Sequence, residues 1–293
     1  MPFSALGDQA DAVTSRLWAW GFSGPENEGV ARIVSAHGDY FHMVCNEKPE
    51  GEILARTKAS AFREGPFPTT GDFVRFDYNP HGESRIVSLL PRASCLERLD
   101  PSSSGFRAQT LAVNFDTLFF AMSANGNASA ARLDRFLALA EASGCRDRVV
   151  VLITKCDLAG DASPADAFGA CGAPVIALSA LTGAGLDAVM EHVRPRQTVA
   201  LIGSSGVGKS TLVNALAGEE WMSTGEIQSW SGKGRHTTTS RELVMLPCGA
   251  MALDTPGLRE LGVLGVDGFD AKGRVGGATH RFRAPKQQMK LSR

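Results

Sequence analysis

The most informative residues form a glycine-rich run from Gly203 to Ser210, which reads GSSGVGKS and fits the pattern GxxxxGK[ST]. Glycines let such a loop turn its backbone N–H groups toward phosphate oxygens, and a helix that begins there favours an anion. Lys209 is the type of residue that reaches the β- and γ-phosphates of a nucleotide, and the Ser210 hydroxyl is the type that binds Mg²⁺. A glycine-rich turn without function is the alternative, but a strand-like run precedes the motif and a helical run follows it. The run therefore predicts a phosphate-binding loop, with contacts assigned to Gly203, Ser204, Ser205, Gly206, Val207, Gly208, Lys209, Ser210 and Thr211.

A second motif, Asp254-Thr255-Pro256-Gly257, follows an apolar run that ends at Leu253. A carboxylate at the end of a strand can face Mg²⁺ directly or through water, and we assign this role to Asp254. Gly257 can offer its backbone N–H to a γ-phosphate. Such a tetrapeptide is also a common turn, so the interpretation depends on the phosphate loop that begins 51 residues earlier.

Between these motifs lies the switch segment, residues 232–239, which reads GKGRHTTT. We expect Thr238 to complete the Mg²⁺ shell with Ser210 and Asp254 when a γ-phosphate is present. Leu258 cannot polarise water, so we predict that His236 positions the attacking water while Lys209 acts on the phosphates as the second catalytic residue. A solvent-facing or structural role for His236, and a plain hydroxyl-rich loop, are the alternatives.

The guanine motif, residues 154–157, ends another apolar strand-like run and consists of Thr154, Lys155, Cys156 and Asp157. The Asp157 carboxylate can accept both the N1–H and the 2-amino hydrogens of guanine, a donor pair that adenine lacks. The stem of Lys155 can lie over the base. After a further strand-like run, Ser179, Ala180 and Leu181 can supply a backbone N–H to the guanine O6.

The elements that must position these residues fall into two groups. The first group consists of five short strand-like runs, at 30–35, 40–45, 52–58, 72–78 and 85–90, which suit a small β-barrel of the OB type. From Thr110 the pattern alternates strand and helix, which predicts a mostly parallel sheet with helices on both faces. We expect strands at 117–123, 148–155, 174–179, 198–202, 242–246 and 250–253, and helices at 131–142, 186–193 and 209–217.

The fold expected is therefore α/β, with an OB-like barrel in front of a nucleotide-binding domain. A basic barrel face would bind RNA, although the same positions can be ordinary solvent-facing residues: Arg56, Lys58, Arg63, Arg75 and Arg85. The domains expected are an N-terminal extension at 1–29, the RNA-binding barrel at 30–92, a linker at 93–109, the nucleotide domain at 110–264 and a short tail at 265–293.

Taken together, these motifs resemble those of GTP-binding domains related to translation factors, but in a circularly permuted order. The base-reading residues precede the phosphate-binding residues, which a compact domain tolerates when its ends lie close together. A permuted domain behind a small barrel resembles the RsgA family (also called YjeQ or EngC) of small-ribosomal-subunit biogenesis GTPases. The resemblance covers roughly residues 28–262 and includes the Q-x4-N-x-D pattern from Gln109 to Asp116.

The resemblance implies a GTPase that uses GTP and Mg²⁺, binds the small ribosomal subunit and its rRNA, assists late maturation and leaves after hydrolysis. Two features depart from the family. Thr154 stands where the family has Asn, and after Leu264 we find no cysteine and one histidine, His280, so the family's zinc ligands are absent. We expect a short basic tail in place of the zinc domain, as a shortened variant or a displaced reading frame. The alternative function is a GTP-binding, ribosome-associated RNA module with impaired turnover.

Composition and charge fit these expectations. Of 293 residues, 43% are hydrophobic and 21% charged, which is typical of globular chains and excludes a disordered or fibrous one. The net charge is −1, although residues 271–293 carry seven Lys and Arg and no Asp or Glu. Six scattered cysteines without a CxxC pair, no secretory signal and no long apolar run predict a cytoplasmic protein that binds no membrane. Nothing indicates an obligate dimer, so we expect a monomer.

Overall fold

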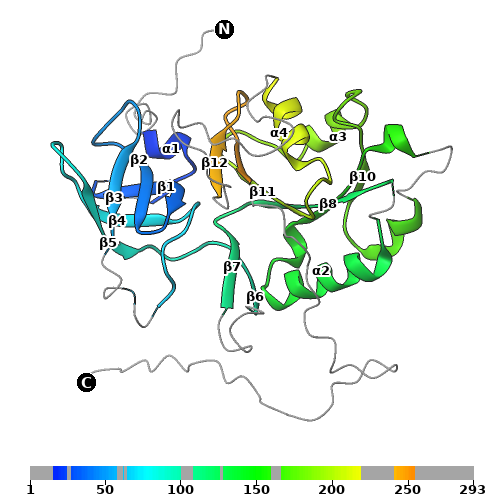
Figure 1. Ribbon diagram of the computed structural model, residues 1–293, viewed down its shortest axis with the longest axis horizontal. Helices are drawn as coiled ribbons and strands as arrows, with labels where there is room; N and C mark the ends of the chain where they lie inside the picture. Colours follow the sequence, from blue (N-terminus) through cyan, green and yellow to red (C-terminus); the bar gives the residue numbers. More distant parts are fainter. Residues whose placement is uncertain are drawn as a thin grey trace, which may run out of the picture. The chain divides into compact units, whose positions relative to one another are not determined.

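The computed structural model describes residues 16–24, 28–57, 62, 65–99, 108–125, 128–159, 166–218 and 241–254. Its elements are shown in Figure 1. No helix in these ranges has the length and apolar character that a membrane span would need.

The first part of the chain is a closed barrel, as the sequence predicts. Its strands are β1 (Val30–His37), β2 (Tyr40–Cys45), β3 (Ile53–Arg56), β4 (Phe73–Asp77) and β5 (Ser84–Leu89). The pairings run β1 with β2, β2 with β3, β3 with β5, β5 with β4, and β4 back to β1, which closes the ring. Among the described barrel strands, β3 and β5 pair in parallel and the other pairs are antiparallel.

Alternation along these strands builds the barrel core. Inward side chains such as Ile33, Phe41, Val74 and Ile86 are almost fully buried, while their neighbours in sequence face outward. Gly38 (φ +61°) makes the tight turn between β1 and β2. The predicted strand at 40–45 coincides with β2, and the other four predicted strands differ from the observed ones by one or two residues at their ends.

The prediction of a linker at 93–109 has to be corrected, because one strand lies within this range and a second strand begins in it. β6 (Cys95–Leu99) and β7 (Ala108–Val113) pair in antiparallel fashion. The prolines and serines that suggested a linker are Pro91 and Ser94, which the structure describes, and those of the run 101–105, which lies outside the described residues. Leu96 is fully buried, and the hydroxyl of Ser143 donates to the backbone of Glu97, so this strand pair is packed against the second part of the chain.

The second part of the chain is an α/β unit with the expected alternation. Its elements in chain order are β8 (Thr117–Ser123), α2 (Ala130–Ala142), η3 (Arg146–Arg148), β9 (Val149–Thr154), η4 (Cys156–Leu158), η5 (Asp166–Cys171), β10 (Val175–Ala177), α3 (Leu186–Met190), β11 (Thr198–Gly203), α4 (Lys209–Ala217), β12 (Glu242–Met245) and β13 (Met251–Asp254). The strand order is β10-β9-β8-β11-β13-β12. The first five strands are parallel and β12 is antiparallel.

Helices cover both faces of this sheet, as predicted. On one face, Leu212 and Val213 of α4 and Val189 of α3 pack with Phe119 and Leu201. On the other face, Phe136 of α2 stacks on Phe120 with ring centroids 3.9 Å apart. Figure 1 shows α2 on one side of the strands and α3 and α4 on the other. Phe119 and Phe120 therefore illustrate the alternation of a strand that is buried on both faces.

The barrel and the α/β sheet are joined by backbone pairing and by one buried arginine. Ser35 of β1 pairs with Glu242 of β12, so the described strands form one continuous sheet of eleven. Arg32 of β1 is 1% exposed, donates to Thr198 Oγ1 at 2.8 Å and to the Trp20 carbonyl, and lies over the ring of Phe73. Burial lowers the pKa of Arg32 to about 10, although the charges of Asp116 and Asp72 oppose that shift.

A short helix before the barrel packs against it. This helix, α1 (Arg16–Ala19), buries Leu17 completely. The backbone N–H of Leu17 donates to Asn46 after β2, and the guanidinium of Arg196 lies over the Trp18 ring at 3.7 Å. Part of the expected N-terminal extension is therefore integral to the fold.

Candidate functional site

The predicted phosphate and base motifs meet at one edge of the sheet. The phosphate loop follows β11, Asp254 ends β13, the guanine motif follows β9, and Ser179 follows β10. These strands are parallel neighbours, with β8 between β9 and β11, so their carboxyl ends share an edge. In open α/β sheets this edge is where ligands bind.

The phosphate loop has the backbone conformation that its glycines predict. Gly206 (φ +76°) and Gly208 (φ +97°) are left-handed, and Gly208 precedes the first turn of α4. A Cβ on Gly203 would lie 2.6 Å from the carbonyl oxygen of Ala121, so only glycine fits between β11 and β8. The loop is thus fixed at the strand and free to curve before the helix.

Lys209 is buried and held by the loop itself. Its Nζ donates to the carbonyl oxygens of Gly203 at 2.9 Å and Ser204 at 3.0 Å. Burial lowers the pKa of Lys209, and the negative charge of Asp254 opposes that shift. A buried cation whose partners are neutral carbonyls is suited to exchange them for phosphate oxygens.

Asp254 is buried beside the phosphate loop and is incompletely satisfied. It is 7% exposed, pairs in register with Leu201 of β11, and its Oδ1 has no hydrogen-bond partner among the described residues. Burial raises the pKa of Asp254 to about 6, Lys209 opposes the shift and Glu242 adds to it. A carboxylate oxygen without a partner among the described residues is the kind of oxygen donor that Mg²⁺ prefers.

Thr154 ties the guanine motif to the phosphate loop. Its hydroxyl is buried and lies 2.5 Å from the Val207 carbonyl oxygen and 3.1 Å from that of Met122. Its single proton is therefore directed at backbone carbonyls of the protein. Lys155 is left-handed (φ +60°), and its Cε lies 3.9 Å from the position of a Cβ on Gly208. Thr154 and Lys155 are thus brought to the phosphate loop.

The remaining base-motif residues lie at the rim. Asp157 is exposed, and the Cys156 thiol turns back to the carbonyl of Ile153 at 3.1 Å. The buried hydroxyl of Ser179 accepts the backbone N–H of Thr182, so it shapes a turn. Ala180 is half-buried and the side chain of Leu181 is 82% exposed.

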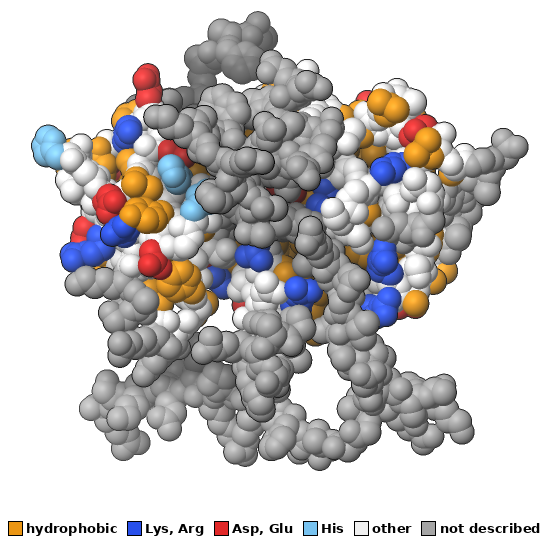
Figure 2. Space-filling model, viewed as in Figure 1, with side chains coloured by type: hydrophobic (Ala, Val, Ile, Leu, Met, Phe, Trp, Pro, Cys, Tyr) orange, Lys and Arg blue, Asp and Glu red, His pale blue; other side chains and the backbone are white. Residues whose placement is uncertain are grey.

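Several predicted residues cannot be placed. His236, Thr238 and Gly257 lie outside the described residues, as do Lys58 and Arg63 of the predicted basic barrel face. On that face, Arg56 pairs with Glu83 at 3.1 Å and Arg85 with Asp77 at 2.7 Å. Figure 2 shows basic, acidic and apolar side chains interspersed there, on the left of the view.

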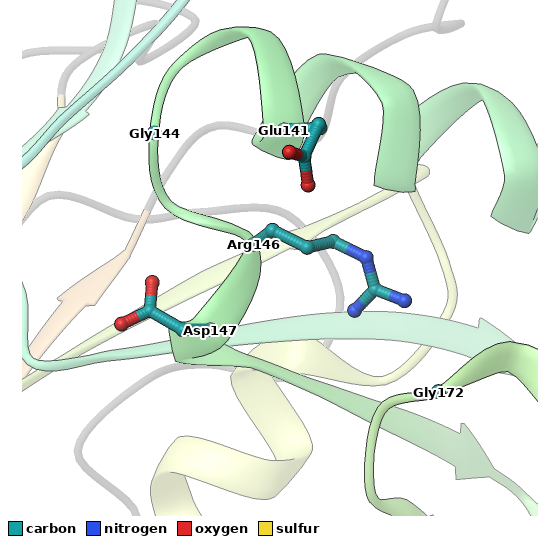
Figure 3. A pocket seen from close by; sticks show the side chains of 5 residues that line it. All are labelled: Glu141, Gly144, Arg146, Asp147 and Gly172. Carbon is teal, nitrogen blue, oxygen red and sulfur yellow. The ribbon is translucent and has the colours of Figure 1, made fainter.

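An open depression of about 510 Å³ lies away from the site (Figure 3). It is lined by Glu141, Gly144, Arg146, Asp147 and Gly172. These residues precede β9 or β10, so the depression lies at the amino ends of strands whose carboxyl ends carry the guanine motif. Arg146 donates to the carbonyl of Cys171 at 2.5 Å.

One residue at the site has no signal in the sequence. Arg132 of α2 donates from Nη1 to Ser204 Oγ in the phosphate loop at 3.2 Å. One of two arginines on a helix that mixes apolar and polar residues does not stand out in the sequence. Its position became evident only once the helix was placed beside the loop.

Comparison with known proteins identifies the chain's relatives. Residues 89–264 match the family model described as RsgA GTPase. The chain is 37% identical over 236 residues to small ribosomal subunit biogenesis GTPase RsgA 2 of Lactiplantibacillus plantarum, covering 79% of this chain and 66% of the relative. It is 41% identical over 237 residues to small ribosomal subunit biogenesis GTPase RsgA of Methanosarcina acetivorans, covering 78% and 62%. The chain therefore spans somewhat under two thirds of the length of these curated relatives.

Solved structures share the fold. YjeQ from Thermotoga maritima superposes with a TM-score of 0.54 at 23% identity, covering 78% of this chain and 74% of that one. YloQ, a circularly permuted GTPase, gives a TM-score of 0.52 at 21% identity, covering 83% and 76%. The order of base-reading and phosphate-binding elements along this chain is the permuted one. The chain belongs to the RsgA GTPase family.

Proposed function

We propose that this chain binds GTP with Mg²⁺ and hydrolyses it, in the service of small-ribosomal-subunit biogenesis. The observation that carries the proposal is the buried pair of Lys209 and Asp254 beside a glycine-rich loop at the carboxyl edge of a parallel sheet. The names of the relatives support the ribosomal part, and they favour a GTPase over a module with impaired turnover.

Phosphate binding would exchange protein partners for ligand partners. The Lys209 ammonium leaves the carbonyls of Gly203 and Ser204 for β- and γ-phosphate oxygens. Backbone N–H groups from Gly203 to Thr211 surround the phosphates, and the first turn of α4 adds its dipole. We assign the N–H of Gly257 to the γ-phosphate.

The oxygen ligands proposed for Mg²⁺ are Ser210, Asp254 and Thr238. The first two belong to the described edge of the sheet, and the orphaned oxygen of Asp254 supports the assignment. A bound Mg²⁺ would neutralise charge on the phosphate oxygens. Asp254 must be deprotonated to serve, so its raised pKa makes binding stronger above about pH 6.

For hydrolysis we propose His236 as the residue that orients water, since Leu258 has no group able to do so. Base selection would come from Asp157, which is exposed and therefore open to the N1–H and 2-amino group of guanine. Lys155 would lie along the base, and Ser179, Ala180 and Leu181 would border it. Cys156 would contribute backbone only, because its thiol faces the protein.

The partners proposed are the small ribosomal subunit and its rRNA, with the barrel at 30–92 as the RNA-binding part and the unit at 110–264 as the nucleotide-binding part. We propose that the chain acts as a monomer in the cytoplasm, where the proposed partner is found. No zinc site is proposed.

The test is GTP hydrolysis by the purified chain, alone and with small ribosomal subunits, with ATP as the control nucleotide. We expect GTP-selective turnover that the subunits stimulate. Lys209→Ala is expected to abolish it, and His236→Ala is expected to keep GTP binding while losing the stimulation. Equal turnover of ATP, or stimulated turnover by Lys209→Ala, would contradict the proposal.

A further inference from the structure

Arg132 lies at the edge of the phosphate loop because of the sheet topology. α2 begins at Ala130, shortly after the carboxyl end of β8, and Ala121 of β8 pairs in register with Gly203 of β11. The first turn of α2 therefore reaches the edge where the phosphate loop starts. There the Nη1 of Arg132 donates to Ser204 Oγ at 3.2 Å.

Two cationic side chains meet at Ser204. Arg132 holds its hydroxyl, and Lys209 holds its carbonyl oxygen at 3.0 Å. Because both cations bond to the same residue, an anion bound beside Ser204 would lie within the screening length of about 8 to 10 Å from each of them. Lys209 is the residue that reaches the terminal phosphates of a nucleotide in such loops. Ser204 and Arg132 therefore border the position of those phosphates.

The core fixes the arginine in place. One turn beyond Arg132, Phe136 stacks on Phe120 of β8 with an interplanar angle of 6°, and Leu133 is 2% exposed. The start of the helix therefore cannot drift from the loop without opening the core. The guanidinium of Arg132 bonds to Ser204, and the helix that carries it is fixed by the core. The charge is therefore preorganised, which is the condition for useful electrostatic stabilisation.

We propose that Arg132 is a positioning residue that supplies a second fixed positive charge at the γ-phosphate end of the site, anchored by Ser204. The inference rests on the proposed function as a GTP-binding protein. Its specific consequence is a preference for GTP over GDP. The triphosphate carries more negative charge and carries it closer to Arg132.

The experiment measures the dissociation constants of a non-hydrolysable GTP analogue and of GDP, with Mg²⁺, for the full chain and four variants. Arg132→Gln removes the charge, Arg132→Lys keeps it, and Ser204→Ala removes the anchor. Arg146→Gln is the matched control, because Arg146 also donates to one protein oxygen but lies at the amino ends of the strands.

For Arg132→Gln we expect affinity for the analogue to fall about 5- to 10-fold and affinity for GDP less than about 2-fold. Arg132→Lys should restore most of the preference, Ser204→Ala should lose about 3-fold, and the control should match wild type. The loss in Arg132→Gln should also shrink in 1 M salt, where the Debye length is about 3 Å.

Two results would overturn the inference. Equal losses for the analogue and GDP in Arg132→Gln would mean that the arginine only supports the loop. No change for either nucleotide would mean that it has no part in binding. If the wild-type chain binds neither nucleotide, the proposed function itself fails, and this outcome is recognised before any variant is compared.

Discussion

At the scale of single residues, the site concentrates polar groups that folding alone would disfavour. Asp254 is a buried carboxylate, one oxygen of which has no partner within the described part of the chain, and Lys209 is a buried ammonium that contacts neutral carbonyls. Both pKa values shift toward the neutral form, mainly because of burial. Such groups are retained at the expense of stability when a ligand needs them.

The first prediction concerns the stability of Asp254→Asn without nucleotide. The pKa of Asp254 rises from 3.8 to about 6 on folding, so its stabilising contribution is present below pH 3.8 and is lost as pH rises through about 6. Above that range the wild-type carboxylate costs about 3 kcal/mol. Asp254→Asn should therefore be more stable than wild type at about pH 8 and similar at about pH 3.5.

Urea unfolding across this pH range measures the difference in unfolding free energy between Asp254→Asn and the wild type. Asp77→Asn is the control, because Asp77 forms an exposed ion pair with Arg85 and should change stability by less than about 1 kcal/mol. A less stable Asp254→Asn at about pH 8 would contradict the prediction. Asp254→Asn should also lose Mg²⁺-dependent GTP binding, which shows that the gain in stability has a functional cost.

A second prediction concerns Thr154, whose hydroxyl links two segments. Thr154→Val keeps the shape but removes the one hydroxyl proton that lies between the backbone carbonyls of Val207 and Met122. We expect a loss of about 1–3 kcal/mol in unfolding free energy and weaker binding of both GTP and GDP. Thr154→Ser keeps the hydroxyl and should retain most of the affinity. Fluorescence titration with a labelled nucleotide measures these affinities, and equal nucleotide affinities of Thr154→Val and Thr154→Ser would refute the prediction.

At the scale of elements, turns and junctions decide how the parts are joined. Asn114 follows β7 in a left-handed conformation (φ +50°), which asparagine tolerates better than most residues. Its side chain accepts the N–H of Ala93 and donates to the carbonyl of Gly71 in the barrel. The Q-x4-N-x-D pattern in the sequence thus has a structural role at the junction.

The third prediction separates these two contributions of Asn114. Asn114→Ala should lose about 2–4 kcal/mol, from two buried hydrogen bonds and from backbone strain. Asn114→Gly should lose less, because glycine adopts this conformation freely and only the hydrogen bonds are missing. Chemical denaturation of the two variants gives the difference. If they are equally unstable, the backbone conformation contributes nothing.

Elements with a local signal were predictable. Period-two runs and turn residues indicate the five strands of the barrel and the alternation of strands and helices from Thr117 onward. The predicted positions of these elements therefore agree with the observed ones within a few residues. The β6–β7 pair was missed because Cys95–Leu99 is short and mixed, and its flanking Pro and Ser residues are typical of linkers.

The residues of the candidate site likewise fall into those that a local sequence signal indicates and those that it does not. The phosphate-loop motif and Asp254 could be proposed from the sequence because their chemistry depends on residues close in sequence, and their roles stay predictions. Arg132 and the bond between Thr154 and Val207 were missed because they join segments that are distant along the chain. Periodicity and spacing carry no information about such contacts.

At the scale of the whole molecule, one buried arginine joins the barrel to the sheet. Arg32 contacts the loop after α1, the residue after β7 and the first residue of β11. Each contact belongs to a different segment. Removing one partner of such a buried network leaves several groups unsatisfied.

The fourth prediction is therefore a loss of stability and of cooperativity in Arg32→Ala. We expect about 3–5 kcal/mol less stability and separate unfolding of the barrel and the nucleotide-binding part, whereas the wild type is expected to unfold in one transition. In a background in which Trp221 and Trp230 are replaced by Phe, tryptophan fluorescence reports the surroundings of Trp18 and Trp20, and protection by nucleotide reports the unfolding of the nucleotide-binding part. Arg75→Ala, on the exposed face of β4, is the comparison variant. A single transition at the wild-type midpoint would contradict the prediction.

The permuted strand order has a consequence for how the molecule is made. Of the strands of the α/β sheet, β8, β9 and β10 are synthesised first. β11, which lies between β8 and β13, is synthesised only later. Six of the seven residues of β8 are buried in the finished sheet. Until β11 emerges, a nascent chain therefore displays an apolar strand with one unpaired edge, which is a template for joining another chain. A polypeptide arrested before Thr198 should aggregate, whereas one extended beyond Gly203 has the strand that covers this edge.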